Sequence, residues 1–95
     1  MDGIGKIRER IDEADREMVG LWEKRMQLCR EVARLKRERG MGVRDRKREA
    51  EILESRGGML RDPALKDYLV PVMEEILRQS RRMQENILEE EGKHV

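Results

Sequence analysis

The fold is decided by residues 4–39, which read IGKIRERIDEADREMVGLWEKRMQLCREVARLKRER. Apolar side chains recur in this stretch at steps of three and four residues, which is the spacing of one apolar stripe on an α-helix. No proline interrupts the stretch, and its basic last turn followed by Gly40-Met41-Gly42 is typical of a helix C-terminus. The sequence therefore predicts one long helix, whose stripe consists of Ile4, Ile7, Ile11, Ala14, Met18, Leu21, Leu28, Val32 and Leu35.

A helix of this length does not fit inside a compact protein of this size. At about 1.5 Å per residue, about 36 residues span about 54 Å, whereas a compact chain of this length has a radius of gyration near 12 Å, that is, about 2.2·N^0.38 Å. The seven methionines and scarce aromatic residues also predict a thin aliphatic core, which one protomer would not complete alone. We therefore expect a second chain to cover the overhanging part of the helix.

Shorter helices are expected after this one. Asp45 is placed to cap a second helix, which runs from Arg46 to about Ser55 and ends at Gly57-Gly58. Asp62-Pro63 is typical of another helix start, because proline is favoured in the first helical position. The pattern therefore predicts a second helix of about ten residues and a short one beginning at Pro63.

Pro71 is expected to divide the last part of the chain. Proline inside a helix removes a hydrogen bond and clashes with the preceding turn, so a break or kink is predicted near Val70, followed by a third main helix from Pro71 to about Glu90. The predicted fold class is all-α, with a three-helix protomer, a very long first helix and an intertwined helical homodimer. We expect residues 1–95 to form a single domain. The apolar stripe of the last helix consists of Leu69, Val72, Met73, Ile76, Leu77, Met83, Ile87 and Leu88.

The composition excludes several classes of function. Charged residues make up 45% of the chain, but 22 basic and 21 acidic residues leave a formal net charge of +1. A nucleic-acid-binding domain is usually clearly basic and offers aromatic platforms, whereas this chain has no phenylalanine, one tryptophan and one tyrosine. A single cysteine, Cys29, and a single histidine, His94, exclude an intrachain disulfide and a zinc site. We expect neither a nucleic-acid partner nor a metal or other cofactor.

The sequence also gives no sign of a membrane protein. No apolar run approaches the roughly 18 residues of a membrane span, and the first residues do not resemble a secretory signal. The expectation is a protein without a membrane association, located in the cytoplasm.

Polar residues interrupt the apolar stripes of the first and last helices. The first stripe should continue through position 25, where arginine stands instead. In the last helix, Ser80 and Gln84 lie four residues apart within the stripe. Such residues need partners, because a buried polar group left without one costs about 1–3 kcal/mol. A structural explanation pairs Arg25 with Glu49 on a facing helix, and a functional explanation supplies a bound ligand.

Other charged residues are placed to face the same ligand. Lys36 lies three turns after Arg25, so both project from nearly the same face, about 16 Å apart along the helix axis. Arg48 and Glu49 follow the Asp45 turn. The set contains several cations, a carboxylate, an amide and a hydroxyl, but no nucleophile paired with a base and no phosphate-binding loop. It suits a small dianion, held by shape and charge rather than by covalent chemistry.

Arg8 flanks the same stripe near the N-terminus. It lies about 25 Å from Arg25 along a straight helix, which is too far for both to touch one small ligand within a protomer. An antiparallel partner helix would bring the Arg8 of a second chain beside Arg25 of the first. A site shared between two chains follows if Arg8 is functional.

Taken in order, these residues resemble the all-helical class of chorismate mutases. The resemblance covers essentially the whole chain apart from residues 55–70. It implies a homodimer of three-helix protomers with two active sites, each using residues of both chains. It also implies conversion of chorismate to prephenate, a pericyclic rearrangement in phenylalanine and tyrosine biosynthesis. The matching pieces are Ile7-Arg8-Glu9-Arg10-Ile11-Asp12, Glu23-Lys24-Arg25, Val32-Ala33-Arg34-Leu35-Lys36, Val43-Arg44-Asp45-Arg46-Lys47-Arg48-Glu49, and Ser80 with Gln84.

The resemblance implies a role for each site residue. Arg25 and the Arg8 of the second chain would bind the two carboxylates of chorismate, with Ser80 and Arg48 assisting. Other residues would contact the ether oxygen and the ring. Lys36 and Gln84 would donate to the ether oxygen, and Glu49 and the backbone at Asp45 would hold the ring hydroxyl.

Two alternative functions stay open. Isochorismate-pyruvate lyase uses the same scaffold and would also need Arg8, Arg25, Lys36 and Gln84, but it replaces the turn at residues 45–49 with a different loop. A non-catalytic helical dimer explains the long stripe and the charged helix faces. It does not explain an arginine and a glutamine together on buried faces.

Overall fold

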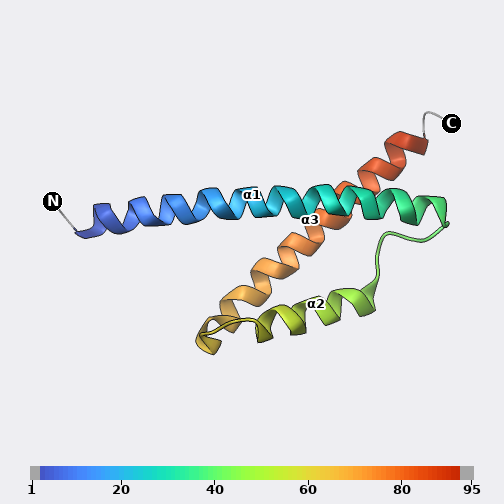
Figure 1. Cartoon of the computed structure of the whole chain (residues 1–95). Helices are drawn as coiled ribbons and strands as arrows, with labels where there is room; N and C mark the ends of the chain where they lie inside the picture. Colours follow the sequence, from blue (N-terminus) through green and yellow to red (C-terminus); the bar gives the residue numbers. More distant parts are fainter. Residues whose placement is uncertain (1–2, 93–95) are drawn as a thin grey trace.

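The protein is an open arrangement of three helices, seen in the computed structural model of Figure 1, which describes residues 3–92. Helix α1 spans Gly3–Glu38, α2 spans Arg46–Gly58, a 3₁₀ turn η1 spans Pro63–Leu65, and α3 spans Lys66–Gly92. The predicted all-α class with a very long first helix is confirmed. No helix within the described part of the chain is long and apolar enough to cross a membrane. His94, counted above in excluding a zinc site, lies outside the described residues.

The long first helix forms and ends as its sequence predicts. The amide of Met41 donates to the carbonyl of Lys36 at 2.8 Å, and the amide of Gly40 donates to the carbonyl of Arg37 at 3.1 Å. Gly40 has φ +65°, a left-handed conformation that glycine adopts without a steric penalty. These bonds satisfy carbonyls of the last turn, and the chain then turns back towards α2 (Figure 1).

Helix α2 begins and ends at the residues that the sequence predicts. The Asp45 side chain accepts from the amide of Arg48 at 3.0 Å, as expected of an N-cap. The helix ends at Gly58, which confirms the end expected at Gly57-Gly58, although its helical residues continue past Ser55. Gly57 is buried against the Lys66 side chain, and a Cβ at this position would lie 3.0 Å from Lys66 Cε. Gly57, in the last turn of α2, therefore also allows the close approach of the Lys66 side chain.

The break predicted near Val70 is wrong. Asp62 caps the turn that starts at Pro63, with its side chain accepting from the amide of Ala64 at 3.0 Å, and α3 continues from there through Pro71. Pro71 lies in the second turn of α3 at an exposed position. The missing donor therefore costs one hydrogen bond, to the Asp67 carbonyl, near an end where helical hydrogen bonds are already incomplete. The helix remains continuous because its later turns pack on both other helices.

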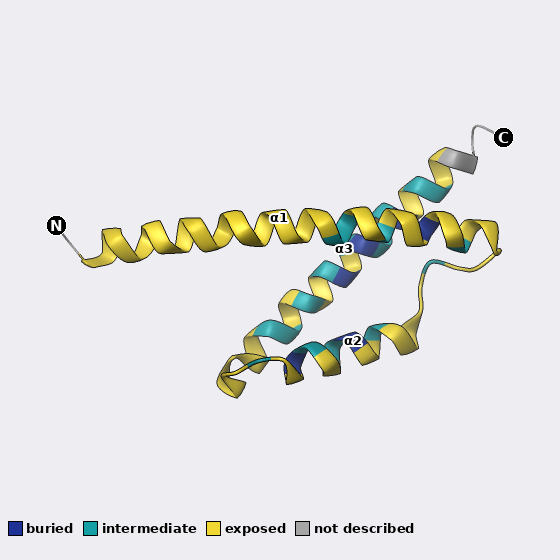
Figure 2. Cartoon of the chain, viewed as in Figure 1, coloured by how far each residue is buried: buried dark blue, intermediate teal, exposed yellow. Residues whose placement is uncertain are grey.

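Helix α3 is the centre of the fold, since it packs against both α1 and α2. In Figure 2 the buried residues gather where α3 crosses α1 and where it faces α2. The buried apolar side chains of the protomer are Ala33, Ile52 and Leu77, and the buried polar ones are Ser80 and Gln84. A core this small, with polar groups at its middle, is better suited to forming a site than to stabilising a protomer alone.

The N-terminal half of α1 extends beyond this core. Figure 2 shows it exposed along its whole length. The molecule measures 60 × 27 × 15 Å, and its radius of gyration of 17.1 Å far exceeds the roughly 12 Å of a compact chain. The predicted overhang is therefore present. Its stripe remains exposed within the protomer, including Ile4, Ile7, Ile11, Met18 and Leu21.

Candidate active site

One cavity of about 180 Å³ lies where α1, α2 and α3 approach one another. Residues from all three helices and from the loop before α2 line it. The volume is below the roughly 300–1,000 Å³ typical of drug-sized ligands, so the cavity suits a small molecule. Seven of the eight residues selected from the sequence line it: Arg25, Lys36, Asp45, Arg48, Glu49, Ser80 and Gln84.

Arg25 is half-buried on α1 and is held by α3. Its Nη1 donates to Ser80 Oγ at 2.8 Å and lies 3.7 Å from Cys29 Sγ. Ser80 Oγ in turn donates to the Ile76 carbonyl at 2.8 Å, which fixes the hydroxyl. The alternative pairing of Arg25 with Glu49 is wrong. The guanidinium has five N–H donors, so it can hold a ligand carboxylate while keeping Ser80.

Lys36 lies at the other end of the cavity, in the last turn of α1. Its Nζ donates to the Val43 carbonyl at 2.8 Å, in the loop that leads to α2. An ammonium group has three donors, so two remain for a ligand. The bond to Val43 restricts a long, flexible side chain and holds its charge at the cavity wall.

The start of α2 contributes three cavity residues within one turn. The cap formed by Asp45 fixes the turn, and the amide of Glu49 donates to the Asp45 carbonyl at 3.0 Å. Arg48 is exposed, and among the described residues its guanidinium has no hydrogen-bond or ion-pair partner. It is therefore available to a ligand anion.

Gln84 gives the clearest evidence that the cavity binds a ligand. It is 7% exposed, and its Oε1 is buried with no hydrogen-bond partner among the described residues. A half-turn of the amide exchanges its acceptor and donors, so a ligand can satisfy this position from either side. A buried amide oxygen without a partner costs about 1–3 kcal/mol. The protein therefore has an open polar position that a bound molecule can fill.

Arg8 does not line this cavity. It lies on the exposed N-terminal half of α1, far from the three-helix junction. Within residues 3–92 no ion pair holds its side chain. This agrees with the expectation that Arg8 and Arg25 cannot reach one small ligand within a protomer.

Sequence reasoning missed two residues that line the cavity, Arg81 and Cys29. Cys29 was considered above only in excluding a disulfide and a zinc site, and Arg81 was not singled out. The signal for Arg81 is its spacing, since it lies four residues after Leu77 and three before Gln84, both of which face the cavity. Arg81 Nη1 lies 2.5 Å from Glu49 Oε1.

The charge of the lining indicates what the cavity can bind. Four cationic side chains, Arg25, Lys36, Arg48 and Arg81, face two carboxylates, Asp45 and Glu49, which leaves a net charge of two positive. A larger hollow of about 530 Å³ between α1 and α3 contains none of the predicted site residues. The smaller cavity is the stronger candidate for a ligand-binding site. It combines several charged side chains with a buried amide oxygen that has no hydrogen-bond partner among the described residues.

Comparison with known proteins shows the following similarities. The model of the family described as chorismate mutase type II matches residues 7–85. A protein named 3-dehydroquinate dehydratase from Pyrobaculum aerophilum is 36% identical over 55 residues, which cover 58% of this chain and 18% of that relative. The chain thus spans less than a fifth of the length of this curated relative.

Proposed function

The chain belongs to the chorismate mutase type II family, and on this premise we propose that it converts chorismate to prephenate. The observation that supports this most is the convergence of seven residues, chosen from the sequence, on one cavity with a net charge of two positive. Chorismate carries two carboxylates, so its charge matches the lining. The shared segment covers 18% of the dehydratase, so no dehydratase activity is proposed.

The reaction suits a cavity without a nucleophile. One carbon–oxygen bond of the ether breaks while one carbon–carbon bond forms within the same molecule, and no proton moves. The protein has to fold the enolpyruvyl group over the ring and to stabilise the negative charge that grows on the ether oxygen. Orientation and fixed charges supply these effects, and even a modest enzyme needs about 8 kcal/mol from them.

In this proposal one end of the cavity binds a substrate carboxylate and the other stabilises charge on the ether oxygen. Arg25, oriented by Ser80, binds one carboxylate of the substrate, and Arg48 assists from α2. Lys36 and Gln84 donate to the ether oxygen. Lys36 provides a full positive charge there, and a fixed cation is worth more in a site from which water is excluded than in solution.

Glu49 and the backbone at Asp45 hold the ring hydroxyl in this proposal. Glu49 is an acceptor when ionised, and the cap at Asp45 keeps the first turn of α2 in place beside it. The position of the hydroxyl sets the ring against the enolpyruvyl group. These contacts therefore serve orientation rather than charge stabilisation.

We also propose an intertwined homodimer, in which each cavity receives Arg8 from the other chain. The exposed stripe of α1 supports it, because monomeric proteins seldom expose a continuous apolar surface of this extent. A second argument is an apolar hollow of about 400 Å³ between α1 and α3, which would seat a partner helix. The hollow is lined by Ala14, Met18, Leu21, Met73 and Ile76, among others.

The test is a product assay on the purified protein. Chorismate absorbance is followed while prephenate and pyruvate are both measured, and isochorismate is offered as a second substrate. Prephenate from chorismate is the expected result. Pyruvate from isochorismate alone would assign the lyase reaction instead, and a folded dimer that converts neither substrate would overturn the enzymatic proposal.

A further inference from the structure

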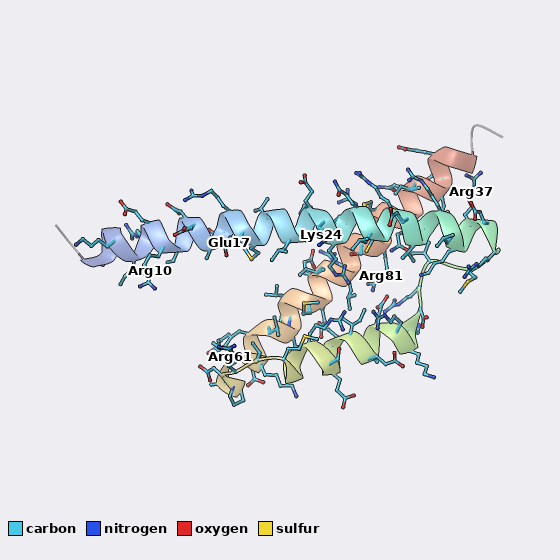
Figure 3. All side chains as sticks on the ribbon, in the orientation of Figure 1. Arg10, Glu17, Lys24, Arg37, Arg61 and Arg81 are labelled. Atoms are coloured by element: carbon cyan, nitrogen blue, oxygen red, sulfur yellow. The ribbon has the colours of Figure 1, made fainter. Side chains whose placement is uncertain are left out.

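Arg81 links two helices across the cavity. It lies on α3, and its Nη1 is 2.5 Å from Oε1 of Glu49 on α2, 32 residues away in the chain. Both side chains are largely shielded, with 21% and 16% of their surfaces exposed. Figure 3 shows Arg81 near the crossing of α3 with α1, on the side that faces α2. This bond is therefore part of the cavity wall rather than an ion pair on the open surface.

The two oxygens of Glu49 are used unequally. Arg81 binds Oε1, and the more exposed Arg44 approaches the same atom, with its Nη2 at 3.7 Å. In the part of the chain that the structure describes, no donor reaches Oε2. A carboxylate can accept at both oxygens. The arginines thus hold Glu49 by one oxygen and leave the other available to a ligand hydroxyl.

Arg81 also sets the charge that a ligand meets. Without it, the lining would have three cations and two carboxylates, a net charge of one positive. A Glu49 carboxylate left with only the more exposed Arg44, at 3.7 Å, would then repel a dianionic ligand in a partly buried cavity, where charges are weakly screened. With Arg81 in place, the carboxylate is neutralised and still accepts a hydrogen bond.

We propose that Arg81 is a positioning residue, which orients Glu49 towards the ring hydroxyl of the substrate and offsets its charge. The proposal rests on the function proposed above. It assigns Arg81 no direct contact with the reacting atoms. The effect of an Arg81 substitution on catalysis must therefore depend on Glu49 and on the ring hydroxyl of the substrate. A residue that only stabilises the fold would show no such dependence.

The experiment is a double-mutant cycle read as kcat/KM. Arg81→Met and Glu49→Gln are made singly and together, and each is assayed with chorismate and with an analogue that lacks the ring hydroxyl. We expect Arg81→Met to lower kcat/KM for chorismate between about 10- and 100-fold. Arg81→Met should change kcat/KM little when it is added to Glu49→Gln and compared with Glu49→Gln alone. It should also change kcat/KM little with the analogue, compared with the wild type on the same analogue. Arg81→Lys should recover part of the loss, because it keeps the charge.

A matched control is Arg78→Met, which removes another arginine–glutamate pair on α3 outside the cavity, between Arg78 and Glu75. It should keep wild-type kcat/KM. Thermal unfolding is recorded for every variant, and Arg81→Gln replaces Arg81→Met if the latter does not fold.

The possible outcomes separate the two proposals. An equal loss in the Glu49→Gln background, an equal loss with the analogue, or no loss at all would overturn the positioning role while the wild type still makes prephenate. A wild type that makes no prephenate would overturn the proposed function, and the role of Arg81 with it.

Discussion

Arg25 and Ser80 lie 55 residues apart in the chain, and Nη1 of Arg25 donates to Oγ of Ser80 at 2.8 Å. The bond joins α1 to α3 near the point where the two helices cross. Each residue interrupts an apolar stripe, so each would be a defect in a helix that served packing alone. Together they form a polar contact that orients a cation at the cavity wall. The contact that packs α1 on α3 therefore also orients Arg25 at the cavity wall.

Ser80→Ala tests this orientation. The variant leaves Nη1 of Arg25 with only the long contact to Cys29 Sγ, so the guanidinium samples more positions before it binds a substrate carboxylate. We expect kcat/KM to fall between about 10- and 100-fold, because a hydrogen bond to a charged group contributes about 1.5–3 kcal/mol and about 1.4 kcal/mol is a factor of ten. Ser55→Ala is the control, since Ser55 does not line the cavity and its hydroxyl donates to the Ile52 carbonyl within α2. Equal kinetics in the two variants would contradict the role of Ser80.

Lys36→Ala tests the source of charge stabilisation. The proposed role is exerted mainly in the transition state, so kcat should fall more than KM rises. The expected loss in kcat is about 10²- to 10³-fold, as for the removal of one donor to a developing oxyanion. Lys24→Ala serves as the control, because Lys24 is exposed on the same helix. A Lys36→Ala protein with nearly normal kcat would exclude Lys36 from the reaction.

A mixture of two inactive variants tests the shared site. Arg8→Ala and Lys36→Ala chains are unfolded together and refolded, so that mixed dimers form. In a mixed dimer, one cavity has both wild-type residues and the other has neither. A one-to-one mixture should therefore recover about a quarter of wild-type activity, since half the dimers are mixed and each has one intact site. A mixture no more active than the separate variants would show that the two residues serve no common site.

Arg25→Leu combined with Gln84→Leu separates function from stability. Both residues are polar groups on packed faces, and Gln84 Oε1 has no partner among the described residues. Well-packed apolar replacements of buried polar or charged groups are often neutral or stabilising. We expect an unchanged or higher Tm and a loss of turnover. Turnover at the wild-type level would remove both residues from the site, whichever way the Tm moved.

The exposed pair on α3 predicts a pH effect that is independent of the cavity. Hydrogen bonds from Arg78 and Gln79 lower the pKa of Glu75 from 4.5 to about 2. A lowered folded-state pKa stabilises the protein above the unfolded-state value, and this contribution is lost as the pH falls from 4.5 towards 2. Arg78→Met should bring the pKa of Glu75 back towards 4.5 in an NMR titration of the side-chain carboxyl. An unchanged titration would show that Arg78 does not hold the carboxylate in solution.

Much of the site could be predicted because helical spacing is a local property. Steps of three and four residues define a face, so Arg25, Ser80 and Gln84 were recognisable as polar residues on faces that should be apolar. The caps at Asp45 and Asp62 were recognisable for the same reason, since each carboxylate bonds to an amide two or three residues later. Their positions need no knowledge of how the helices pack.

Tertiary structure alone decided the contacts that depend on how the helices cross. The continuity of α3 through Pro71 follows from packing on two other helices, and Gly57 stays helical where Lys66 passes over it. Arg81 has an ordinary sequence environment, and its partner Glu49 is 32 residues away. Local spacing determines which way a side chain faces, but which partner it meets depends on the crossing of α2 and α3. The residues of the site could therefore be chosen from the sequence, whereas the bonds that hold them in place could not.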